Sequence, residues 1–169
     1  MTIAQVLKKT SLFKLLSDDQ LKAAVQLGQA KSFEPDEEIF KHGQEAKTIY
    51  VLLDGSVCLR IDAPEELDPM AETLLEPGSV FGTEALAKAN MYNVTAECVT
   101  RTKVLAMDSA GLQEIIRQEP LVGIEVMAEL VQIYLNRLNY TRTAITNLFR
   151  IYKSQTDKSK VFDVYAELP

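Results

Sequence analysis

The chain has 169 residues, the length of one ordinary domain, so a single hydrophobic core is the starting expectation. Hydrophobic residues make up 47% and charged residues 25%, with 7 Gly and 6 Pro, which excludes disordered, collagen-like and disulfide-scaffold classes. The net charge of −6 argues against the broad basic face that direct DNA binding needs. Two cysteines and one histidine cannot by themselves supply a zinc or iron–sulfur ligand set.

Helical spacing opens the chain over residues 3–30. Apolar positions recur at helical intervals, and Ser17 precedes two aspartates, which is a typical N-cap signal. Two short helices are therefore predicted. Lysines interrupt every apolar stretch of the N-terminus and no small-residue cleavage site follows, so we expect no export signal, no membrane partner and a cytoplasmic location.

Between Phe33 and Asp108 the apolar period changes to two, which predicts several short, half-buried antiparallel strands in a barrel or jelly roll. Turn residues separate the strands, and Asp54-Gly55 predicts a two-residue hairpin. Cys58 and Cys98 alternate with residues of the opposite face, which favours structural, reduced thiols. The single histidine, His42, precedes a glycine and is expected to be a turn residue.

The helical period returns after Asp108, first over Ser109–Gln118 and then from Pro120, whose missing N–H is not needed in a first turn. Along this last helix an apolar seam follows an alternating three-four spacing, with Thr141 as its one polar member. This spacing predicts a parallel two-fold homodimer, and the alternative is that the stripe packs on the chain's own core. The seam consists of Ile124, Met127, Val131, Tyr134, Leu138, Ile145, Leu148 and Tyr152.

A second apolar stripe accompanies only the first half of this helix, so the first half can be covered on two sides and the second half on one. Its members are Val122, Val126, Leu130 and Ile133. We expect one domain over residues 1–153, including the long helix at 120–153, followed by a tail at 154–169. The sequence leaves open whether the segment VFDVYAEL in this tail packs or is disordered.

The most distinctive segment is PGSVFGTEAL at 77–86, followed by NVTA at 93–96. A glycine-bearing strand end that feeds a short helix presents backbone N–H groups, here from about Thr83 to Leu86, as a site for an anion. Such a turn also serves merely to change the chain direction. The spacing alone leaves both interpretations open.

Over about residues 12–150 the chain resembles the cyclic nucleotide-binding domain family. The resemblance is carried by the two segments above and the helix from Pro120, and by the segments LFKLLSDDQL, FEPDEEIFKHGQ, IYVLLDGSVCL and YNVTAECVTRTKVLAMD. The resemblance implies an α+β fold in which an eight-stranded antiparallel β-roll, or jelly roll, is flanked by N-terminal helices and a long C-terminal helix. It also implies that the cyclic phosphate and ribose are held by the segment between Phe81 and Thr95, which we call the cassette, with Thr141 as a candidate base contact. The candidate ligand-binding residues are Phe81, Gly82, Thr83, Glu84, Ala85, Leu86, Tyr92, Asn93 and Thr95.

The cassette departs from the family pattern at its two charged positions. Thr83 stands where the family has a ribose-binding Glu, and Tyr92 stands where it has a phosphate-pairing Arg. The neighbouring Glu84 is not expected to replace the missing Glu, because it points elsewhere. Losing a charge-assisted phosphate contact removes roughly 1.5–3 kcal/mol, so cAMP and cGMP are predicted to bind weakly or not at all. Tyr92 is expected either to fill the vacated space or to stack on a ligand.

No set of residues points to catalysis, so the chain is predicted not to be an enzyme and to need no cofactor beyond a possible cyclic nucleotide or other small ligand. The first hypothesis is a regulatory sensor module that binds a non-standard ligand, or a cyclic nucleotide weakly, and signals through the helix dimer. The alternative is a ligand-free scaffold for protein interactions. Tyr92 and Met91 filling the cassette would favour the scaffold, and a cavity above Gly82–Leu86 would favour the sensor.

Overall fold

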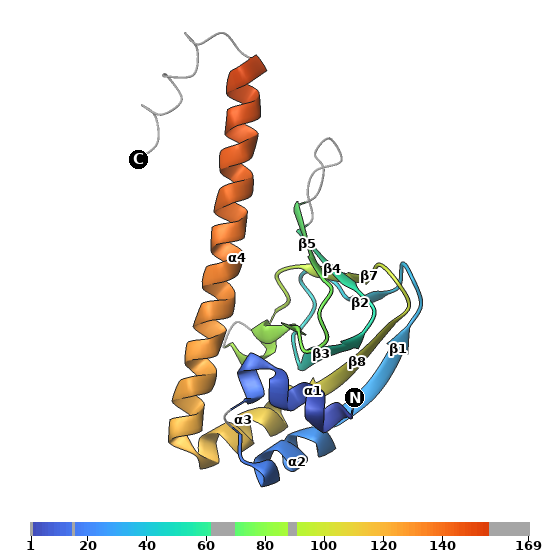
Figure 1. Cartoon of the computed structure of the whole chain (residues 1–169), viewed down its shortest axis with the longest axis vertical. Helices are drawn as coiled ribbons and strands as arrows, with labels where there is room; N and C mark the ends of the chain where they lie inside the picture. The colour runs from blue at the N-terminus through green and yellow to red at the C-terminus, as the bar shows by residue number, and fades with distance from the viewer. Residues whose placement is uncertain (1, 15, 62–69, 88–90, 156–169) are drawn as a thin grey trace. The chain divides into compact units, whose positions relative to one another are not determined.

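The computed structural model describes residues 2–14, 16–61, 70–87 and 91–155 of the chain (Figure 1). Two antiparallel four-stranded sheets form a β-roll with helices before and after it, which confirms the predicted α+β jelly-roll class. The chain divides into two compact units, Met1–Leu130 and Val131–Pro169. The division falls within the last helix.

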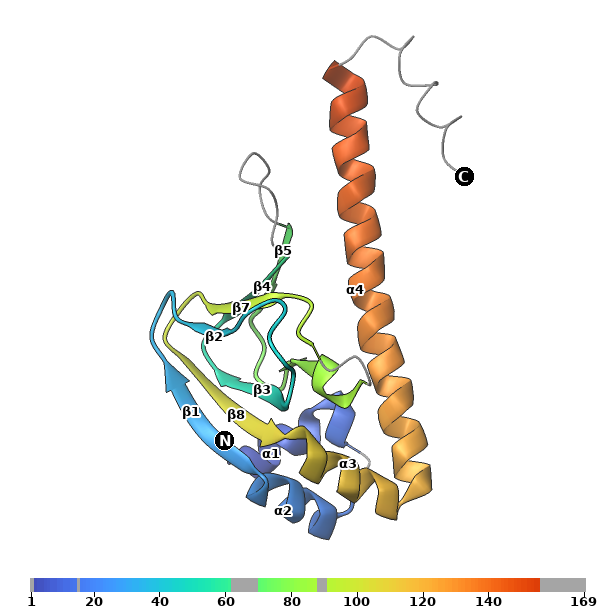
Figure 2. The same ribbon diagram turned by 180° about the vertical axis from the view of Figure 1, so that it is seen from behind.

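The N-terminal helices confirm the prediction of helical structure at the start of the chain. They are α1 (Ile3–Lys9), the 3-10 helix η1 (Ser11–Phe13) and α2 (Asp18–Gln26). Figure 2 shows α1 and α2 grouped with α3 (Ser109–Gln118) at one end of the roll. Apolar residues on these helices, such as Leu7, Phe13 and Leu112, are buried in the core.

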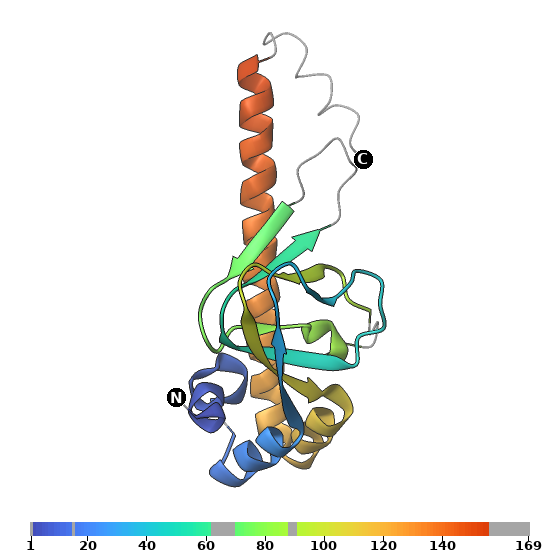
Figure 3. The same cartoon turned by 90° about the vertical axis from the view of Figure 1, so that its right-hand side faces the viewer.

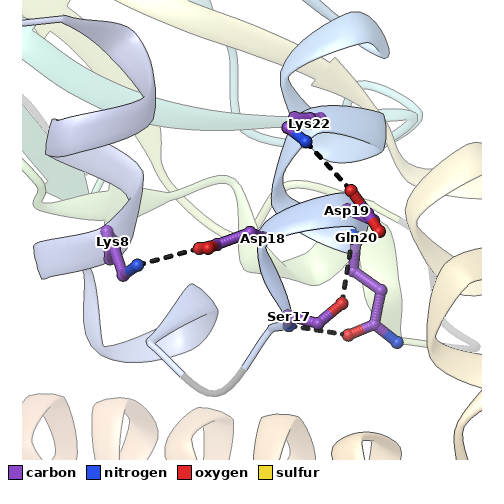
Figure 4. Close-up of polar contacts among 6 residues, drawn as sticks. All are labelled: Lys8, Ser17, Asp18, Asp19, Gln20 and Lys22. Atoms are coloured by element: carbon purple, nitrogen blue, oxygen red, sulfur yellow. Dashed lines mark hydrogen bonds and ion pairs between the residues drawn. The ribbon is translucent and has the colours of Figure 1, made fainter.

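Ser17 caps α2 as its sequence predicts (Figure 4). Its hydroxyl accepts a hydrogen bond from the backbone N–H of Gln20 at 3.3 Å, and the Gln20 side-chain oxygen accepts one from the Ser17 N–H at 2.9 Å. Both N–H groups would otherwise lack a partner inside the helix. An exposed ion pair between Lys8 and Asp18, at 2.8 Å, joins α1 to the first turn of α2 and adds little stability.

The two sheets curve around a common interior (Figure 3). The first has the strand order β1-β8-β3-β6 and the second β2-β7-β4-β5, with every pairing antiparallel. The strands are β1 (Gly28–Phe33), β2 (Glu38–Phe40), β3 (Thr48–Asp54), β4 (Val57–Ile61), β5 (Met70–Leu74), β6 (Val80–Phe81), β7 (Thr95–Cys98) and β8 (Thr102–Asp108).

The strand region begins earlier than predicted, because β1 starts at Gly28 and residues 28–30 are not helical. Gly28 pairs with Met107 of β8. A Cβ at Gly28 would lie 2.6 Å from the Leu105 side chain, so glycine at this position leaves room for that side chain. Pairing with a distant strand therefore overrides the local helical period.

The predicted hairpin at Asp54-Gly55 is wrong, although the turn is present. β3 pairs with β6 and β8, whereas β4 pairs with β5 and β7, so the turn carries the chain from one sheet to the other. Gly55 has a φ of 88°, and a Cβ there would lie 2.5 Å from the carbonyl oxygen of Arg101. A corner between sheets requires this left-handed backbone as much as a hairpin does.

The last helix, α4 (Pro120–Gln155), has 36 residues and begins at the predicted proline. Val126 and Leu130 are buried in the core of the first unit and Val122 packs against it, as expected for the second apolar stripe. An ion pair between Lys14 and Glu129 joins the N-terminal region to the same part of α4. Among the described helices, none is both long and apolar enough to cross a membrane.

Candidate functional site

The cassette begins where β6 ends. Gly82 has a φ of 68° and leads into the short 3-10 helix η2 (Thr83–Leu86). A Cβ at Gly82 would lie 3.0 Å from the carbonyl oxygen of Thr48, 3.1 Å from the Tyr50 ring and 3.2 Å from the Tyr92 ring. Glycine therefore allows both the turn and the close approach of these groups.

Tyr92 lies inside the protein, with only 4% of its surface exposed. Its hydroxyl donates a hydrogen bond to the carbonyl oxygen of Thr48 at 2.8 Å and accepts one from the Thr48 N–H at 3.3 Å. Its ring stacks on Phe40, with centroids 3.8 Å apart and planes at 14°. The phenol is thus engaged by the backbone at the start of β3, and its ring fills interior space.

Tyr92 belongs to an aromatic cluster of four buried rings: Phe40, Tyr50, Phe81 and Tyr92. The centroids of Tyr50 and Phe81 lie 5.2 Å apart, and those of Phe40 and Phe81 lie 6.0 Å apart. Such offset aromatic pairs contribute about 0.5–1.5 kcal/mol each beyond simple burial. The candidate residue Phe81 is therefore a core residue that links the cassette to β2 and β3.

Phe40 and Tyr50 were missed as members of this site by reasoning from the sequence. Both lie in motifs that resemble the family, but nothing local marks them as neighbours of the cassette. Tyr50 contacts Phe81 because β3 and β6 pair in a register that places these two residues opposite each other, although they are far apart in the sequence. The alternation of apolar residues in IYVLL marks a buried face without specifying that register.

Backbone hydrogen bonds hold the segment around Tyr92 to the turn between β2 and β3. The Tyr92 N–H donates to the Gln44 carbonyl oxygen at 2.9 Å, and the Gly43 N–H donates to the Tyr92 carbonyl oxygen at 2.8 Å. The His42 N–H donates to the buried Thr95 hydroxyl at 3.1 Å, and His42 lies in a turn as predicted. The Thr95 oxygen thus accepts a hydrogen bond from the protein's own backbone.

The remaining cassette residues divide into buried and exposed positions. Thr83, Glu84 and Ala85 are buried and Leu86 is half-buried, whereas Asn93 is exposed. Met91 is 54% exposed, so of the two residues expected to fill the cassette only Tyr92 does so. Cys58 is half-buried and Cys98 buried, both as free thiols.

The electrostatics around Tyr92 favour its neutral form. Burial, followed by the nearby Tyr50 phenol, raises the pKa of Tyr92, and the Glu84 carboxylate adds a smaller contribution in the same direction. Burial also raises the pKa of Tyr50. The sequence from Gly78 to Cys98 has a single basic residue, Lys88, which lies outside the described residues. Of the two carboxylates in this region, Glu84 is buried and Glu97 is ion-paired with Arg60 of β4 at 3.4 Å.

The predicted seam on α4 consists of exposed apolar residues. Their exposed fractions range from 36% for Tyr134 to 65% for Ile124. Thr141, the candidate base contact, is partly buried and belongs to the second unit. Its role as a base contact stays a prediction.

Comparisons with known proteins agree with the resemblance. A family model for the cyclic nucleotide-binding domain matches residues 30–119. A protein of Rhodopseudomonas palustris, provisionally named a potassium channel protein, is 30% identical over 118 residues, which are 70% of this chain and 28% of the relative. The chain thus spans little more than a quarter of the length of that curated relative.

Solved structures show the same fold. A protein of Geobacter metallireducens, provisionally named a cyclic nucleotide-binding protein, has 27% identity and a TM-score of 0.69, over 82% of this chain and 99% of that one. The catabolite activator protein of Thermus thermophilus has 26% identity and a TM-score of 0.63, over 82% of this chain and 63% of that one. With more than half of its length matched by the family model, this chain belongs to the cyclic nucleotide-binding domain family.

Proposed function

We propose that residues 1–153 form a non-enzymatic regulatory module whose phosphate position is filled by its own Tyr92. The module binds cAMP and cGMP weakly or not at all, so its roll acts as a ligand-free scaffold for protein interactions, and α4 forms a homodimer. The observation that carries this proposal is the pair of hydrogen bonds between the Tyr92 hydroxyl and the backbone of Thr48.

The argument compares what a cyclic phosphate needs with what the cassette offers. A bound phosphate needs a cation, because a partly buried anion without one loses hydration and gains little in return. The residue at the family's arginine position is a neutral tyrosine whose hydroxyl already has two backbone partners. Glu84 adds a buried carboxylate near the same phenol, which opposes an anionic ligand.

The position of Tyr92 supports the ligand-free scaffold over the sensor of a non-standard ligand. Its ring contacts Gly82 and stacks on Phe40, so space between the cassette and β2 is occupied by protein atoms. A ligand entering there would have to displace a side chain that makes two hydrogen bonds and a stacking contact. Its binding free energy would be reduced by the cost of that displacement.

Calorimetric titration with cAMP and cGMP tests the proposal. We expect no binding, or a dissociation constant well above 1 μM, and a value at or below about 1 μM, which corresponds to ~8.2 kcal/mol, would contradict it. The double variant Tyr92→Arg with Thr83→Glu restores the two family residues. It should bind cAMP at least tenfold more tightly than the unmodified chain if the surrounding geometry persists, with Lys47→Arg as a matched control at an exposed site.

The homodimer rests on the exposed seam of α4. Burying a large apolar side chain contributes roughly 1.5–3 kcal/mol, and residues such as Leu138, Leu148 and Tyr152 are more than half exposed. A second copy of the same helix offers matching residues at the same three-four spacing, so a parallel two-fold pair would cover them. Thr141, as the one polar seam position, would fix the register of the pair.

A further inference from the structure

The seam of α4 fixes which residues would face each other beside it in the proposed parallel homodimer. Seam residues occupy the first and fourth positions of each heptad. The fifth and seventh positions flank them and meet the flanking positions of the partner helix. Over residues 131–155 the flanking positions hold Arg137 and Arg142 and otherwise only apolar residues. The charge beside this part of the seam is therefore entirely positive.

Arg137 of one chain faces Arg142 of its partner in this register. In a parallel pair the seventh position of one heptad meets the fifth position of the next heptad on the other helix, and Arg142 lies five residues after Arg137. The two-fold symmetry repeats this contact on the other side of the pair, so four guanidinium groups flank the layer of Thr141. Residues 131–155 contain no acidic residue that could neutralise them.

The two arginines differ in their surroundings within one chain. Arg142 is exposed, whereas Arg137 is half-buried and has an interaction of its own within the chain. A guanidinium group has five N–H donors, so Arg137 can keep that interaction and still donate to a further acceptor. Pairing of the helices would then add a second guanidinium group beside it.

Two guanidinium groups that face each other attract an anion with more than one negative charge. Like charges at these positions weaken a helix pair, and an anion between them reverses the sign of that interaction. A guanidinium group binds phosphate oxygens through two parallel hydrogen bonds. A phosphate group with two negative charges matches both arginines in charge, whereas a carboxylate or a cyclic phosphate diester has only one negative charge.

We propose that the parallel homodimer binds two phosphate dianions, each held by Arg142 of one chain and Arg137 of the other. The site exists only in the dimer, because each chain supplies one of its two arginines. Binding therefore stabilises the dimer by mass action. The proposal rests on the α4 homodimer of the proposed function and adds a ligand class that controls how tightly the helices pair.

Sedimentation equilibrium of the full chain tests this site with AMP and cAMP, at equal ionic strength set with sodium chloride. At about pH 8 the phosphate monoester of AMP has two negative charges, whereas the diester of cAMP has one. Millimolar AMP should lower the dimer dissociation constant at least tenfold, and inorganic pyrophosphate should act in the same direction. The same concentration of cAMP should have little effect. Both nucleotides have the same nucleoside, so the difference between them isolates the charge of the phosphate.

Charge reversal tests the pairing of the two arginines. Arg142→Glu should strengthen the dimer at least tenfold in sodium chloride, because the new carboxylate faces Arg137 of the partner, and should abolish the response to AMP. Adding Arg137→Glu to this variant again places like charges opposite each other and should weaken the dimer. Arg150→Glu makes the same charge change at an exposed position outside the seam and its flanking positions, and it should keep the AMP response.

The anion site would be overturned, with the homodimer left standing, if AMP strengthened the dimer no more than sodium chloride does. An equal response to AMP in Arg142→Glu would also overturn it, because the effect would then be a general one of the salt. A greater effect of cAMP than of AMP would locate binding in the cassette and contradict both proposals. A chain that stays monomeric at tens of micromolar in every solution would likewise refute both.

Discussion

The cassette and the second half of α4 differ in how far their apolar and aromatic side chains are buried. In the cassette, Tyr92 is buried, stacked on Phe40 and hydrogen-bonded to the backbone of Thr48. In the helix, Leu138 and Leu148 are about 60% exposed. The cassette, where the family holds its ligand, is thus filled by the chain's own side chains, whereas the second half of α4 leaves large apolar side chains exposed. The proposed homodimer would cover these helix residues, whereas the aromatic rings of the cassette are already buried by the chain itself.

The largest expected effect concerns the exposed seam of α4. Replacing Leu138 and Ile145 by aspartate should convert the proposed homodimer into monomers, because two charges in each chain would have to be buried in the seam. Analytical ultracentrifugation measures the change. Leu121→Asp is a matched control at an exposed position of α4 outside the seam and should leave the dimer intact. If the unmodified chain were monomeric at tens of micromolar, that result would contradict the proposed homodimer.

The next largest effect concerns the buried aromatic side chain of Tyr92 in the cassette. Tyr92→Ala should lower the free energy of unfolding by about 3–5 kcal/mol, because it removes a buried aromatic side chain and leaves a cavity. Urea denaturation followed by circular dichroism gives the value. Tyr140→Ala, at a half-exposed tyrosine of α4, should cost much less. A loss below about 1 kcal/mol for Tyr92→Ala would mean that the cassette tolerates an empty space.

A smaller change isolates the hydroxyl. Tyr92→Phe keeps the ring on Phe40 but removes both hydrogen bonds to Thr48, which should cost about 1–2 kcal/mol. Burial raises the pKa of the Tyr92 phenol, so its neutral form stabilises the native state fully below the ordinary tyrosine pKa of ~10. Above that pH the unfolded chain loses the proton first, and this stabilisation declines as the pH rises toward the native pKa.

The pH dependence supplies the measurement. Denaturation midpoints taken from neutral to strongly alkaline pH should fall less steeply for Tyr92→Phe than for the unmodified chain. Burial also raises the pKa values of Tyr50 and Cys98, which remain in both proteins and contribute to the slope that is left. Identical slopes would contradict a buried, neutral Tyr92.

The smallest expected effect on stability lies outside the cassette and the second half of α4, at the N-cap of α2. Ser17→Ala removes the N-cap of α2 and should cost about 0.5–2 kcal/mol, because the Gln20 N–H loses its partner. Ser32→Ala, at an exposed position of β1, is the control and should change stability by much less. Thermal unfolding of the three proteins gives the ranking, which fails if the two variants are equal.

Signals that act within one turn of the chain were read correctly from the sequence. Ser17 caps α2 and Pro120 begins α4, as their local sequences predict. The errors concern pairing between distant segments. Gly28 joins β8 instead of a helix, and Asp54-Gly55 connects two sheets instead of two paired strands. Local periodicity carries no information about which distant strand will be the neighbour.

The cassette shows the same limit. The replacement of the family's arginine by Tyr92 is visible in the sequence, and so is the expectation that a tyrosine there fills space. The partners of its ring and hydroxyl are not visible, since Phe40 and Thr48 come from β2 and β3 and meet Tyr92 only in the folded roll. The residue types at the site could thus be predicted from the sequence, but the contacts between them could not.

The placement of Tyr92 also determines how the protein can be observed. The chain has 6 tyrosines and no tryptophan, so its intrinsic fluorescence comes from phenol rings alone. A phenol that donates a hydrogen bond to a carbonyl while stacked on another ring differs optically from a phenol in water. Because Tyr92 is held this way at the centre of the cassette, ultraviolet difference spectra of the unlabelled protein would report any opening of that region directly.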